Sequence, residues 1–296
     1  MKIFITGVAG FLGSHLADLM ISEGHTVAGN DNMIGGYTDN VPQNVEFYQV
    51  DCCDLENMTK AMEGCDIVYH TAATAYEGLS VFSPVLVTRN IFEASVTTIT
   101  AAIRNKVKRI VYCSSMARYG HHDKLPYKED YECRPQDPYG IAKKAGEDVL
   151  RNLCDTHGVE YVIAVPHNIV GPRQKYDDPF RNVMSIMLNR MLQGKQPIIY
   201  GDGKQQRCFS YIDDCLYCLN ALAFQDNVVG EVINIGPDEE PITIIKLAEA
   251  CANETGLNLN PIHHDDRPKE VKLAVCSSDK ARQLLGYKTS TNMRQS

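Results

Sequence analysis

The segment DPYGIAK, residues 137–143, places a tyrosine four residues before a lysine and directly after a proline. Proline suits the first turn of a helix, where its missing N–H group is not needed. Residues i and i+4 of a helix share one face, so the side chains of Tyr139 and Lys143 can meet. An ammonium group beside a phenol favours the phenolate, which is a base. Ordinary surface helices also contain this spacing, so its meaning depends on the chain before it.

A glycine-rich turn, GVAGFLG at residues 7–13, lies between the first apolar stretch and a helical pattern. Glycines there permit a tight turn and let backbone N–H groups approach a pyrophosphate at the positive end of a helix. Gly7, Gly10 and Gly13 alone are a weak signal, since plain strand–turn–helix connections also use glycine. Asp31 strengthens it, because a carboxylate at the end of the second strand accepts hydrogen bonds from a ribose and repels a 2′-phosphate. The sequence therefore predicts NAD rather than NADP.

A serine hydroxyl at the end of a predicted strand joins the tyrosine and the lysine as a third residue that could take part in the chemistry. The fifth predicted strand is followed by CSSMARYG, residues 113–120, and the Tyr–Lys pair comes on the next helix. Lys143 and a positively charged nicotinamide would favour the Tyr139 phenolate as a base near neutral pH, while Ser115 shares the hydrogen bond to the substrate oxygen. The spacing of Ser115, Tyr139 and Lys143 thus predicts oxidation and reduction at a carbinol.

Short apolar stretches alternate with helical patterns along the first half of the chain. The predicted strands are Lys2–Thr6, Thr26–Asn30, Val45–Gln49, Ile67–His70, Arg109–Cys113 and Tyr161–Val165. The predicted helices are Gly13–Glu23, Leu55–Met62, Val87–Asn105 and Tyr139–His157. This alternation implies an α/β fold with a doubly wound parallel sheet of Rossmann type and helices on both faces.

The regularity weakens after residue 170, where glycine and proline punctuate shorter elements. This predicts a smaller α/β substrate lobe over the carboxyl edge of the sheet, where ligands of open α/β sheets bind. We therefore expect an NAD-binding domain over residues 1–165 and a mainly substrate-binding lobe over residues 166–296. Later segments of the chain are expected to return to the first domain.

The composition argues against several classes of protein. The chain has 296 residues, of which 44% are hydrophobic, enough to bury a large core. Its net charge of −8 argues against nucleic acid as a partner, since phosphate contact needs a basic face. No apolar run reaches membrane-spanning length and no signal peptide precedes the first strand, so we expect a cytoplasmic protein with no membrane partner. The eleven cysteines are then expected to be reduced thiols.

Two short motifs have the residue types of a metal site. Cys215 and Cys218 are three residues apart, but no second Cys/His pair at matching spacing accompanies them, and their surroundings indicate an amphipathic helix. The run His263-His264-Asp265-Asp266 reads as a solvated turn, because adjacent side chains in a strand or loop point apart. We therefore expect no metal.

Together these motifs resemble the extended short-chain dehydrogenase/reductase family over nearly the whole chain, and within it the sugar-nucleotide enzymes similar to UDP-glucose 4-epimerase. The first-domain matches are GVAGFLG, Asp31-Asn32, the strand-end HTAA, SSMARYG, YGIAK and Asn168-Ile-Val-Gly-Pro172. The matches to the family's second lobe are GDGKQQR at 201–207, Tyr211-Ile-Asp-Asp214, Asn234-Ile-Gly236 and Arg267-Pro268. Such enzymes act on nucleotide sugars with a resident NAD and commonly form homodimers.

The resemblance implies cofactor contacts along the pyrophosphate, adenine and nicotinamide from Gly7, Gly10, Phe11, Leu12, Gly13, Asp31, Asn32, Asp51, Cys52, Thr71, Ala72, Ala73, Asn90, Tyr139, Lys143 and Pro166. It implies contacts to the sugar, diphosphate and nucleoside from Thr74, Ser115, Tyr139, His167, Asn168, Asn182, Ile198, Tyr200, Arg207, Arg267 and Glu270. Two arginines, Arg207 and Arg267, would neutralise the diphosphate. The chain departs from the family's pattern at Arg118, the one arginine that could lie beside C5 of a uronic sugar.

The resemblance also sorts the possible reactions. Dehydrating relatives carry an Asp-Glu pair directly after the strand-end hydroxyl, decarboxylating relatives a Glu, and 3,5-epimerising relatives a Cys. Met116 and Ala117 occupy these positions here. What remains is Ser, Tyr, Lys and NAD, which suffices for 4-epimerisation of a UDP-hexose of the UDP-glucose/UDP-galactose type. An NAD(P)-dependent sugar-nucleotide reductase or dehydrogenase, or a non-catalytic dinucleotide-binding protein on this fold, is the alternative.

A homodimer is expected from the same resemblance. The helices predicted at Val87–Asn105 and Tyr139–His157 pair across the interface in this family. The apolar side chains available for it are Ile91, Val96, Ile99 and Ile103, although burial inside one subunit would explain some of them equally well.

Overall fold

The central sheet has seven parallel strands in a computed structural model that describes residues 1–178, 182–239, 241–265 and 272–290. Their order is β11-β6-β5-β4-β1-β2-β3. The bounds are β1 Lys2–Thr6, β2 Thr26–Asn30, β3 Val45–Tyr48, β4 Ile67–His70, β5 Arg109–Cys113, β6 Glu160–Pro166 and β11 Val232–Ile235. The strand order reverses between β1 and β4, and a crevice for ligands forms at such a reversal. The predicted doubly wound α/β fold is confirmed.

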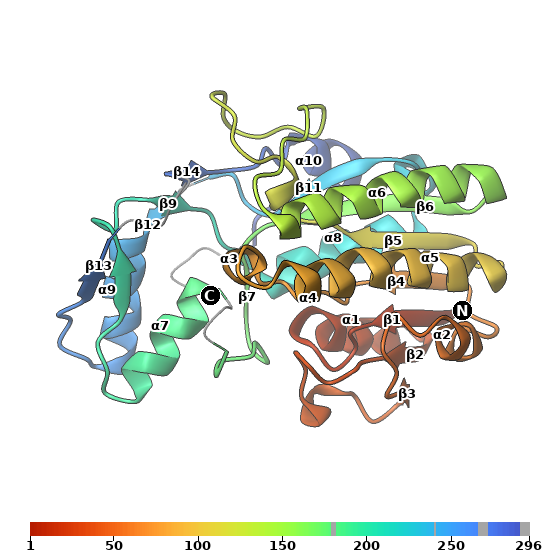
Figure 1. Ribbon diagram of the computed structural model, residues 1–296, viewed down its shortest axis with the longest axis horizontal. Coiled ribbons are helices and arrows are strands. Elements are labelled where there is room, and N and C mark those ends of the chain that lie inside the picture. Colours follow the sequence, from red (N-terminus) through yellow and green to blue (C-terminus); the bar gives the residue numbers. More distant parts are fainter. Residues whose placement is uncertain (179–181, 240, 266–271, 291–296) are drawn as a thin grey trace.

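Helices cover both faces of this sheet (Figure 1). One face carries α2 Leu55–Ala61, α4 Pro84–Thr88, the π-helical turn η2 Arg89–Glu93, α5 Ala94–Arg104 and α6 Pro138–His157. The other carries α1 Phe11–Ser22, α8 Ile212–Phe224 and α10 Asp279–Leu285. Short elements complete this part of the fold: η1 Thr38–Asn40, α3 Glu77–Ser80, η3 Met116–Arg118 and η4 Asp226–Val228.

The helix predicted over Val87–Asn105 is present but begins earlier, at Pro84, and runs through η2 into α5. Its β-branched residues are tolerated because one face is buried: Val87, Ile91 and Ile99 are at most 1% exposed. Packing against the sheet thus overrides weak helix propensity. Ile91 and Ile99 were available either for a subunit interface or for burial within one subunit, and they lie inside the protomer's own core.

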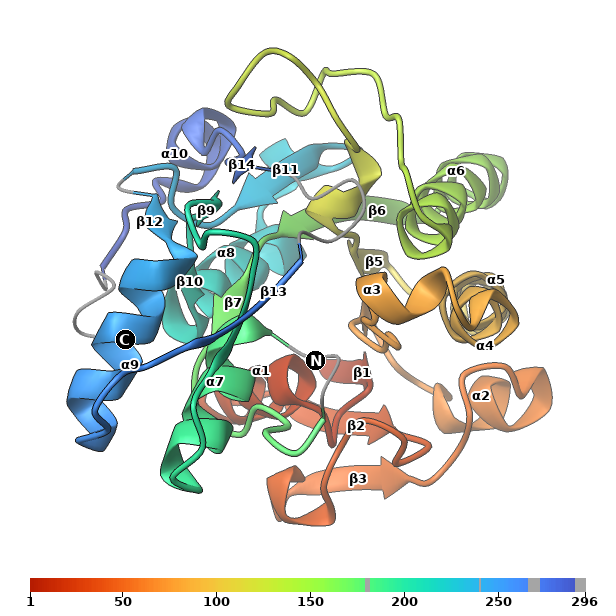
Figure 2. The same ribbon diagram turned by 60° about the vertical axis from the view of Figure 1, so that its left-hand side comes forward.

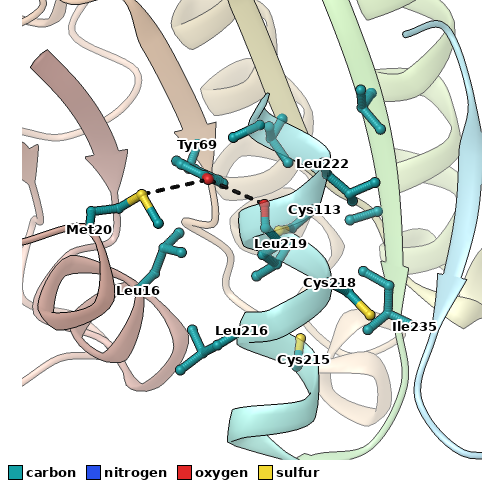
Figure 3. Close-up of a cluster of buried hydrophobic side chains, with 14 of the residues drawn as sticks. Leu16, Met20, Tyr69, Cys113, Cys215, Leu216, Cys218, Leu219, Leu222 and Ile235 are labelled. Carbon is teal, nitrogen blue, oxygen red and sulfur yellow. Dashed lines mark hydrogen bonds between the residues drawn. The ribbon is translucent and has the colours of Figure 1, made fainter. Parts of the chain in front are cut away.

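Residues 212–235 return to the first domain. Strand β11, which the sequence did not predict, pairs with β6, so Asn234 and Ile235 belong to the central sheet and not to the second lobe, which corrects that assignment. Helix α8 packs with α1 over the sheet in a cluster that includes Leu16, Met20 and Tyr69 (Figure 3). The Tyr69 hydroxyl donates to the carbonyl of Leu219 at 3.2 Å, which ties β4 to α8.

Cys215 and Cys218 lie in this hydrophobic cluster, both 0% exposed (Figure 3). Burial raises the pKa of Cys218 to about 12, so the thiolate that a metal needs is disfavoured. All eleven cysteines lie among the described residues and are free thiols. No helix of the described residues is long and apolar enough to span a membrane.

The second lobe is a set of small sheets packed against two helices (Figure 2). Strand β8 Ile198–Tyr200 pairs with β13 Ile262–His264, and β9 Gln206–Arg207 lies between β12 Ile242–Thr243 and β14 Leu273–Ala274. Strand β7 Ile169–Val170 pairs with β10 Ser210–Tyr211 at the junction with the first domain. Helices α7 Val183–Leu192 and α9 Ile244–Thr255 enclose a separate core that includes Met187, Ile199 and Leu247.

Candidate active site

The glycine turn between β1 and α1 is built for close backbone approach. Gly7 has φ +71°, a conformation that other residues rarely adopt, and a Cβ there would lie 2.9 Å from Cα of Ala72. A Cβ on Gly13 would lie 2.2 Å from the carbonyl oxygen of Gly7, so only glycine lets α1 pack this closely on the turn. Gly10 is the N-cap of α1, and because it has no side chain it leaves the helix's first N–H groups uncovered. The turn fits a dinucleotide pyrophosphate.

The ends of β2 and β3 bring together the residues predicted at the adenosine. The Asp31 carboxylate accepts from the N–H of Ala9 at 3.2 Å and of Met33 at 2.8 Å, which fixes it beside the glycine turn. Asn32 donates to Asp51 at 3.1 Å. Burial opposes ionisation of Asp51, but hydrogen bonds from Cys53 and Asn32 hold its pKa below the usual value. These carboxylates fit a cofactor with free ribose hydroxyls.

The end of β4 is held by a buried hydrogen-bonded histidine. The hydroxyl of Thr6 accepts from the N–H groups of Thr71 at 3.1 Å and Ala72 at 3.0 Å. It lies 2.9 Å from His70 Nδ1 and therefore donates its own proton to that nitrogen, because its acceptor sites are used. Burial lowers the pKa of His70 to about 3, with Lys143 adding to the effect, so the imidazole is neutral. The HTAA turn is thereby locked against the glycine turn.

The same histidine begins a chain of buried polar groups that reaches the catalytic helix. His70 Nε2 lies 3.0 Å from the hydroxyl of Ser95, which lies 3.3 Å from that of Tyr112. Tyr112 in turn donates to the backbone carbonyl of Lys143 at 3.4 Å. A Cβ on Gly146 would lie 2.3 Å from the Tyr112 hydroxyl, so glycine at 146 is what admits the tyrosine. Sequence reasoning gave neither Ser95 nor Tyr112 a role in the site, since neither lies in a recognisable motif.

The predicted catalytic residues meet around the carboxyl end of β5. Helix α6 begins as expected, with Asp137 accepting from the N–H of Gly140 at 2.8 Å and Pro138 in the first turn. Lys143, 2% exposed, donates from Nζ to the carbonyl of Cys113 at 2.8 Å. Tyr139 is 7% exposed, and Ser115 caps η3 through the N–H of Ala117. Burial lowers the pKa of Lys143 to about 8, against the opposing influence of Cys113 and Glu147.

Arg118 does not serve as a free cation beside the sugar, which corrects that suggestion. It is 3% exposed, and its Nη2 donates to Glu147 Oε2 at 2.9 Å. Glu147 is fully buried on α6, one turn after Lys143. Sequence reasoning missed Glu147, although its spacing of four from Lys143 and eight from Tyr139 is a helical signal that could have found it.

Two predicted residues bridge the loops after β4 and before α5. Asn90, 8% exposed within η2, donates to the hydroxyl of Thr74 at 3.0 Å. This bond holds the start of the stretch 74–78 close to the helix that follows it. The prediction that Asn90 contacts the cofactor and Thr74 the sugar fits this position beside Ala73.

The turn after β6 carries two predicted substrate residues and the start of α7 a third, and their side chains are partly used in the fold. His167 is 1% exposed and its Nε2 donates to the carbonyl of Pro237 at 2.9 Å, with burial lowering its pKa. Asn168, at φ +42°, donates to the carbonyl of Cys208 at 2.9 Å. Asn182 caps α7 through the N–H of Met184. These bonds hold the turn in place and leave the proposed ligand contacts as predictions.

The stretch 172–178 then crosses back over the first domain. Arg173 pairs with Asp18 on α1 at 2.6 Å. Tyr37, after β2, donates to Asp177 at 2.5 Å, and Tyr76, after β4, bonds to Asp178. Helix α1 and the loops after β2 and β4 are thus tied together by one segment. Sequence reasoning did not anticipate these contacts, because acid–tyrosine pairs far apart in a chain leave no local pattern.

The second lobe supplies the remaining predicted residues. Ile198 and Tyr200 lie on β8, with the Tyr200 ring 5.9 Å from that of His264. Arg207 lies on β9 and donates to the carbonyl of Gln206. Arg267 and Glu270 fall outside the described residues. Among the described residues, no group of three or more His, Cys, Asp or Glu side chains is arranged to hold a metal ion.

This fold and site define a class: an extended short-chain dehydrogenase/reductase with an NAD-binding glycine turn and a Ser–Tyr–Lys set. The sequence profile of the NAD dependent epimerase/dehydratase family matches residues 3–236. The chain therefore belongs to that family, and it is an NAD-dependent enzyme of the sugar-nucleotide epimerase/dehydratase type.

Similar proteins agree with this assignment. A putative UDP-glucose 4-epimerase of Methanocaldococcus jannaschii is 31% identical over 99% of this chain and 95% of its own. The crystal structure of a UDP-glucose 4-epimerase of Thermotoga maritima with UDP-glucose has a TM-score of 0.94 at 29% identity, covering 100% of this chain and 96% of that one. A UDP-glucuronic acid 4-epimerase of Bacillus cereus, solved with UDP-glucuronic acid and NAD, has a TM-score of 0.89 at 29% identity, covering 99% and 96%.

Proposed function

We propose that the protein epimerises a UDP-hexose at C4, with UDP-glucose and UDP-galactose as the first candidates. The observation that carries this proposal is the composition of the serine turn. Ser115 is followed by Met116 and Ala117 in η3, and the carbonyl of Ala117 packs against Gly140 of the catalytic helix. No acid or thiol stands at these two positions to protonate a leaving group or to act on a carbon acid. Reversible oxidation of one carbinol needs neither.

The chain's own groups account for the proton steps of this reaction. Tyr139 would take the proton of the C4 hydroxyl as a phenolate and return it to the epimerised oxygen, and Ser115 would hold that oxygen. The Lys143 ammonium supplies the positive charge that favours the phenolate. Its hydrogen bond to the backbone carbonyl of Cys113 holds it in place. Bound NAD supplies the acceptor and donor of the C4 hydrogen. Its place would be along the glycine turn, Asp31 and the HTAA turn.

The substrate class rests on the second lobe and on relatives that differ in their sugars. Arg207 on β9 would neutralise the diphosphate, and Tyr200 on β8 would pack on the uracil, with Arg267 and Glu270 as expected partners. The sequence did not call specifically for a uronic sugar, and Arg118, the arginine that could have met its carboxylate, is bound to Glu147. A neutral hexose is therefore the first candidate and an N-acetylated hexose the second.

A reductase that releases oxidised cofactor is the alternative reaction. The segment 172–178, tied to Asp18, Tyr37 and Tyr76 across the carboxyl edge, favours retention of the cofactor and hence an epimerase. A non-catalytic dinucleotide-binding protein would have no use for a buried lysine on Tyr139's helix face. Burying that charge costs stability, and a catalytic role would account for this cost.

The test is to incubate the purified protein with UDP-, GDP- and dTDP-sugars and to separate the products. We expect interconversion of UDP-glucose and UDP-galactose without added NAD and without net change in its redox state. Stoichiometric consumption of added NADH or NADPH would instead identify the reductase. Conversion only of a GDP- or dTDP-sugar, or loss of water from the product, would overturn the proposed reaction.

We also propose that the protein is a homodimer through α4 and α6. These neighbouring helices and the residues just before α4 expose large apolar side chains that the sequence did not single out: Phe82 is 81% exposed, Val85 80% and Ile141 53%. Val81 and Leu86 extend the same surface, and such a patch marks an interaction site. Light scattering should give twice the chain mass of 33.0 kDa, whereas a single-chain mass at micromolar concentration would exclude a stable dimer.

A cytoplasmic location remains part of the proposal and rests on the cysteine-rich sequence. Most of the thiols are buried in the protein, and burial raises the pKa of Cys52, Cys113 and Cys218 to about 12. Such thiols have no need of an oxidising compartment. Fractionation of the source cells, with the protein followed by antibody, would test this location.

A further inference from the structure

One buried carboxylate holds both ends of the turn that carries Ser115. Ser114 donates from its hydroxyl to Glu147 Oε1, and Arg118 donates to Glu147 Oε2 at 2.9 Å. Ser115 lies between these two attachments. Glu147 is 0% exposed, Ser114 4% and Arg118 3%, so no water competes for the bonds. The serine turn is therefore fastened to the third turn of α6, the helix that carries Tyr139 and Lys143.

The first turn of α6 makes a second, independent contact with the same segment. A Cβ on Gly140 would lie 2.7 Å from the carbonyl oxygen of Ala117, so the helix and the serine turn touch backbone to backbone beside Tyr139. Two contacts on one helix fix both the distance and the rotation of the turn relative to Tyr139. A shift at Glu147 would change the geometry in which Ser115 and Tyr139 share one substrate oxygen.

The Arg118–Glu147 pair also sets the charge around Lys143. The titratable groups that act on Lys143 are Glu147 on α6, Tyr112 and Cys113 on β5, and His70 on β4, and Tyr139 lies one turn before it on α6. His70 is neutral, and Glu147 is the one carboxyl group in this set. Arg118 balances Glu147 from η3, with Arg151 at 3.5 Å on the exposed side. The Arg118–Glu147 pair thus adds a nearly neutral dipole beside Lys143. An unpaired charge of either sign at this place would disturb Tyr139, the proposed base.

We propose that Arg118 and Glu147 are positioning residues, which hold the Ser115 turn on the catalytic helix and balance the charge that keeps Tyr139 and Lys143 in their working states. Only the rate measurements that test this proposal depend on the proposed reaction. It predicts that removing the charge of Arg118 alone and removing the charge of Glu147 alone have opposite effects on the protonation of Tyr139 and Lys143. Removing the Arg118 cation favours retention of protons on Tyr139 and Lys143, and removing the Glu147 anion favours their loss.

The test compares Arg118→Met, Glu147→Gln and the double variant Arg118→Met/Glu147→Gln. The bell-shaped pH profile of kcat should move by about one pH unit toward alkaline pH in Arg118→Met and toward acid pH in Glu147→Gln. The double variant should recover the wild-type position. Its kcat should stay about tenfold low with KM little changed, because the turn has lost one attachment. Arg118→Lys, which keeps the charge, should keep the wild-type profile.

A second readout does not require turnover. The ionisation of Tyr139 can be followed by tyrosinate absorbance, taking for each protein the difference from the same protein with Tyr139→Phe. The opposite shifts should appear here as well. If the wild type converts no nucleotide sugar but these titrations shift as expected, the proposed reaction fails and the positioning role stands.

The matched control is Glu160→Gln, which neutralises the partner of Arg109 at the other end of β5. It should lower the melting temperature and leave the pH profile and the Tyr139 titration unchanged. If Arg118→Met cannot be purified, the Glu147→Gln and double variants still decide the question. A wild-type kcat, pH profile and Tyr139 titration in the double variant, with only a lower melting temperature, would show that the pair is structural and overturn the proposal.

Discussion

Two buried arginines pair with glutamates at opposite ends of β5. At the amino end, Arg109 is 1% exposed and pairs with Glu160 at 2.7 Å. At the carboxyl end, Arg118 follows the strand and pairs with Glu147. The chemistry of the two pairs is nearly the same. Their neighbours differ: Arg109 faces the end of a helix, whereas the glutamate partner of Arg118 lies one turn after Lys143 on α6.

The amino-end pair completes the fold. Arg109 Nη1 donates to the carbonyls of Leu222 at 3.2 Å, Ala223 at 2.9 Å and Gln225 at 2.7 Å, at the end of α8. The last carbonyls of a helix have no partner within it and favour a cation. Arg109 therefore joins β5 and α8, and no titratable group of the site lies among these contacts. The role of a buried arginine–glutamate pair thus depends on the edge of the sheet at which it lies.

The largest effect is expected at the carboxyl end itself. Tyr139→Phe removes the phenol oxygen and nothing else, and general-base catalysis contributes roughly 10²–10⁴-fold to rate, so kcat should fall by that factor. NAD affinity, measured by titration into the apo protein, should change little, because the glycine turn and Asp31 are untouched. A Tyr139→Phe enzyme that turns over at the wild-type rate would require another base.

At the amino end the corresponding loss should fall on stability. Arg109→Met leaves three carbonyls of α8 without their donor and Glu160 without its cation, which should lower the free energy of unfolding by about 3 kcal/mol. Chemical denaturation would measure this. The kcat of the folded variant should stay within about twofold of wild type, because the helices still pack on both faces of the sheet and the site lies at its other edge. A large loss of kcat in a folded variant would remove the functional distinction between the two ends.

Replacing Lys143 should have opposite effects on stability and on catalysis. Burial lowers its pKa from 10.5 to about 8, so between these values the unfolded chain binds the proton and the folded chain does not. Stability contributed by this group therefore rises with pH from about 8 to 10.5, and below pH 8 the buried charge carries its full cost. Lys143→Met should raise the free energy of unfolding at pH 7 by about 2 kcal/mol while abolishing turnover. A destabilised Lys143→Met protein would contradict this account.

At the carboxyl end of β2, Asp31 is expected to affect binding of the cofactor. Asp31 ends that strand and is held by the N–H groups of Ala9 and Met33, so its place in the fold survives a neutral amide. Asp31→Asn should weaken NAD binding about tenfold, through loss of charge-assisted ribose hydrogen bonds, and should weaken NADP binding less. Calorimetric titration of both cofactors measures the ratio. Equal affinities in the wild type would refute the preference for NAD.

The sequence was informative where a function or turn needs a particular residue at a fixed spacing. Glycines at 7 and 13, the proline at 138 and the Tyr139–Lys143 pair predicted their local structures, because each requirement acts over a few residues. Strand β11 escaped prediction because its partner β6 lies far away in the chain and its four residues show no distinctive pattern. The partner of Arg118 escaped prediction for a related reason: only the fold shows that Glu147 lies opposite it.

The smallest expected effect comes from exchanging each arginine for lysine, and it separates charge from geometry. With one planar group Arg109 makes three hydrogen bonds to carbonyls, a fourth to Glu160, and ion pairs with Glu160 and Asp226, which an ammonium cannot reproduce. Arg109→Lys should therefore lower the free energy of unfolding by about 1 kcal/mol. Arg118 is needed for its charge and for one bond to Glu147, so Arg118→Lys should keep the pH profile of kcat and lose no more than about threefold in rate. Denaturation curves and pH–rate profiles of the two variants, recorded side by side, measure both. If Arg118→Lys shifted the pH profile as far as Arg118→Met, charge balance would not be what the carboxyl-end pair provides.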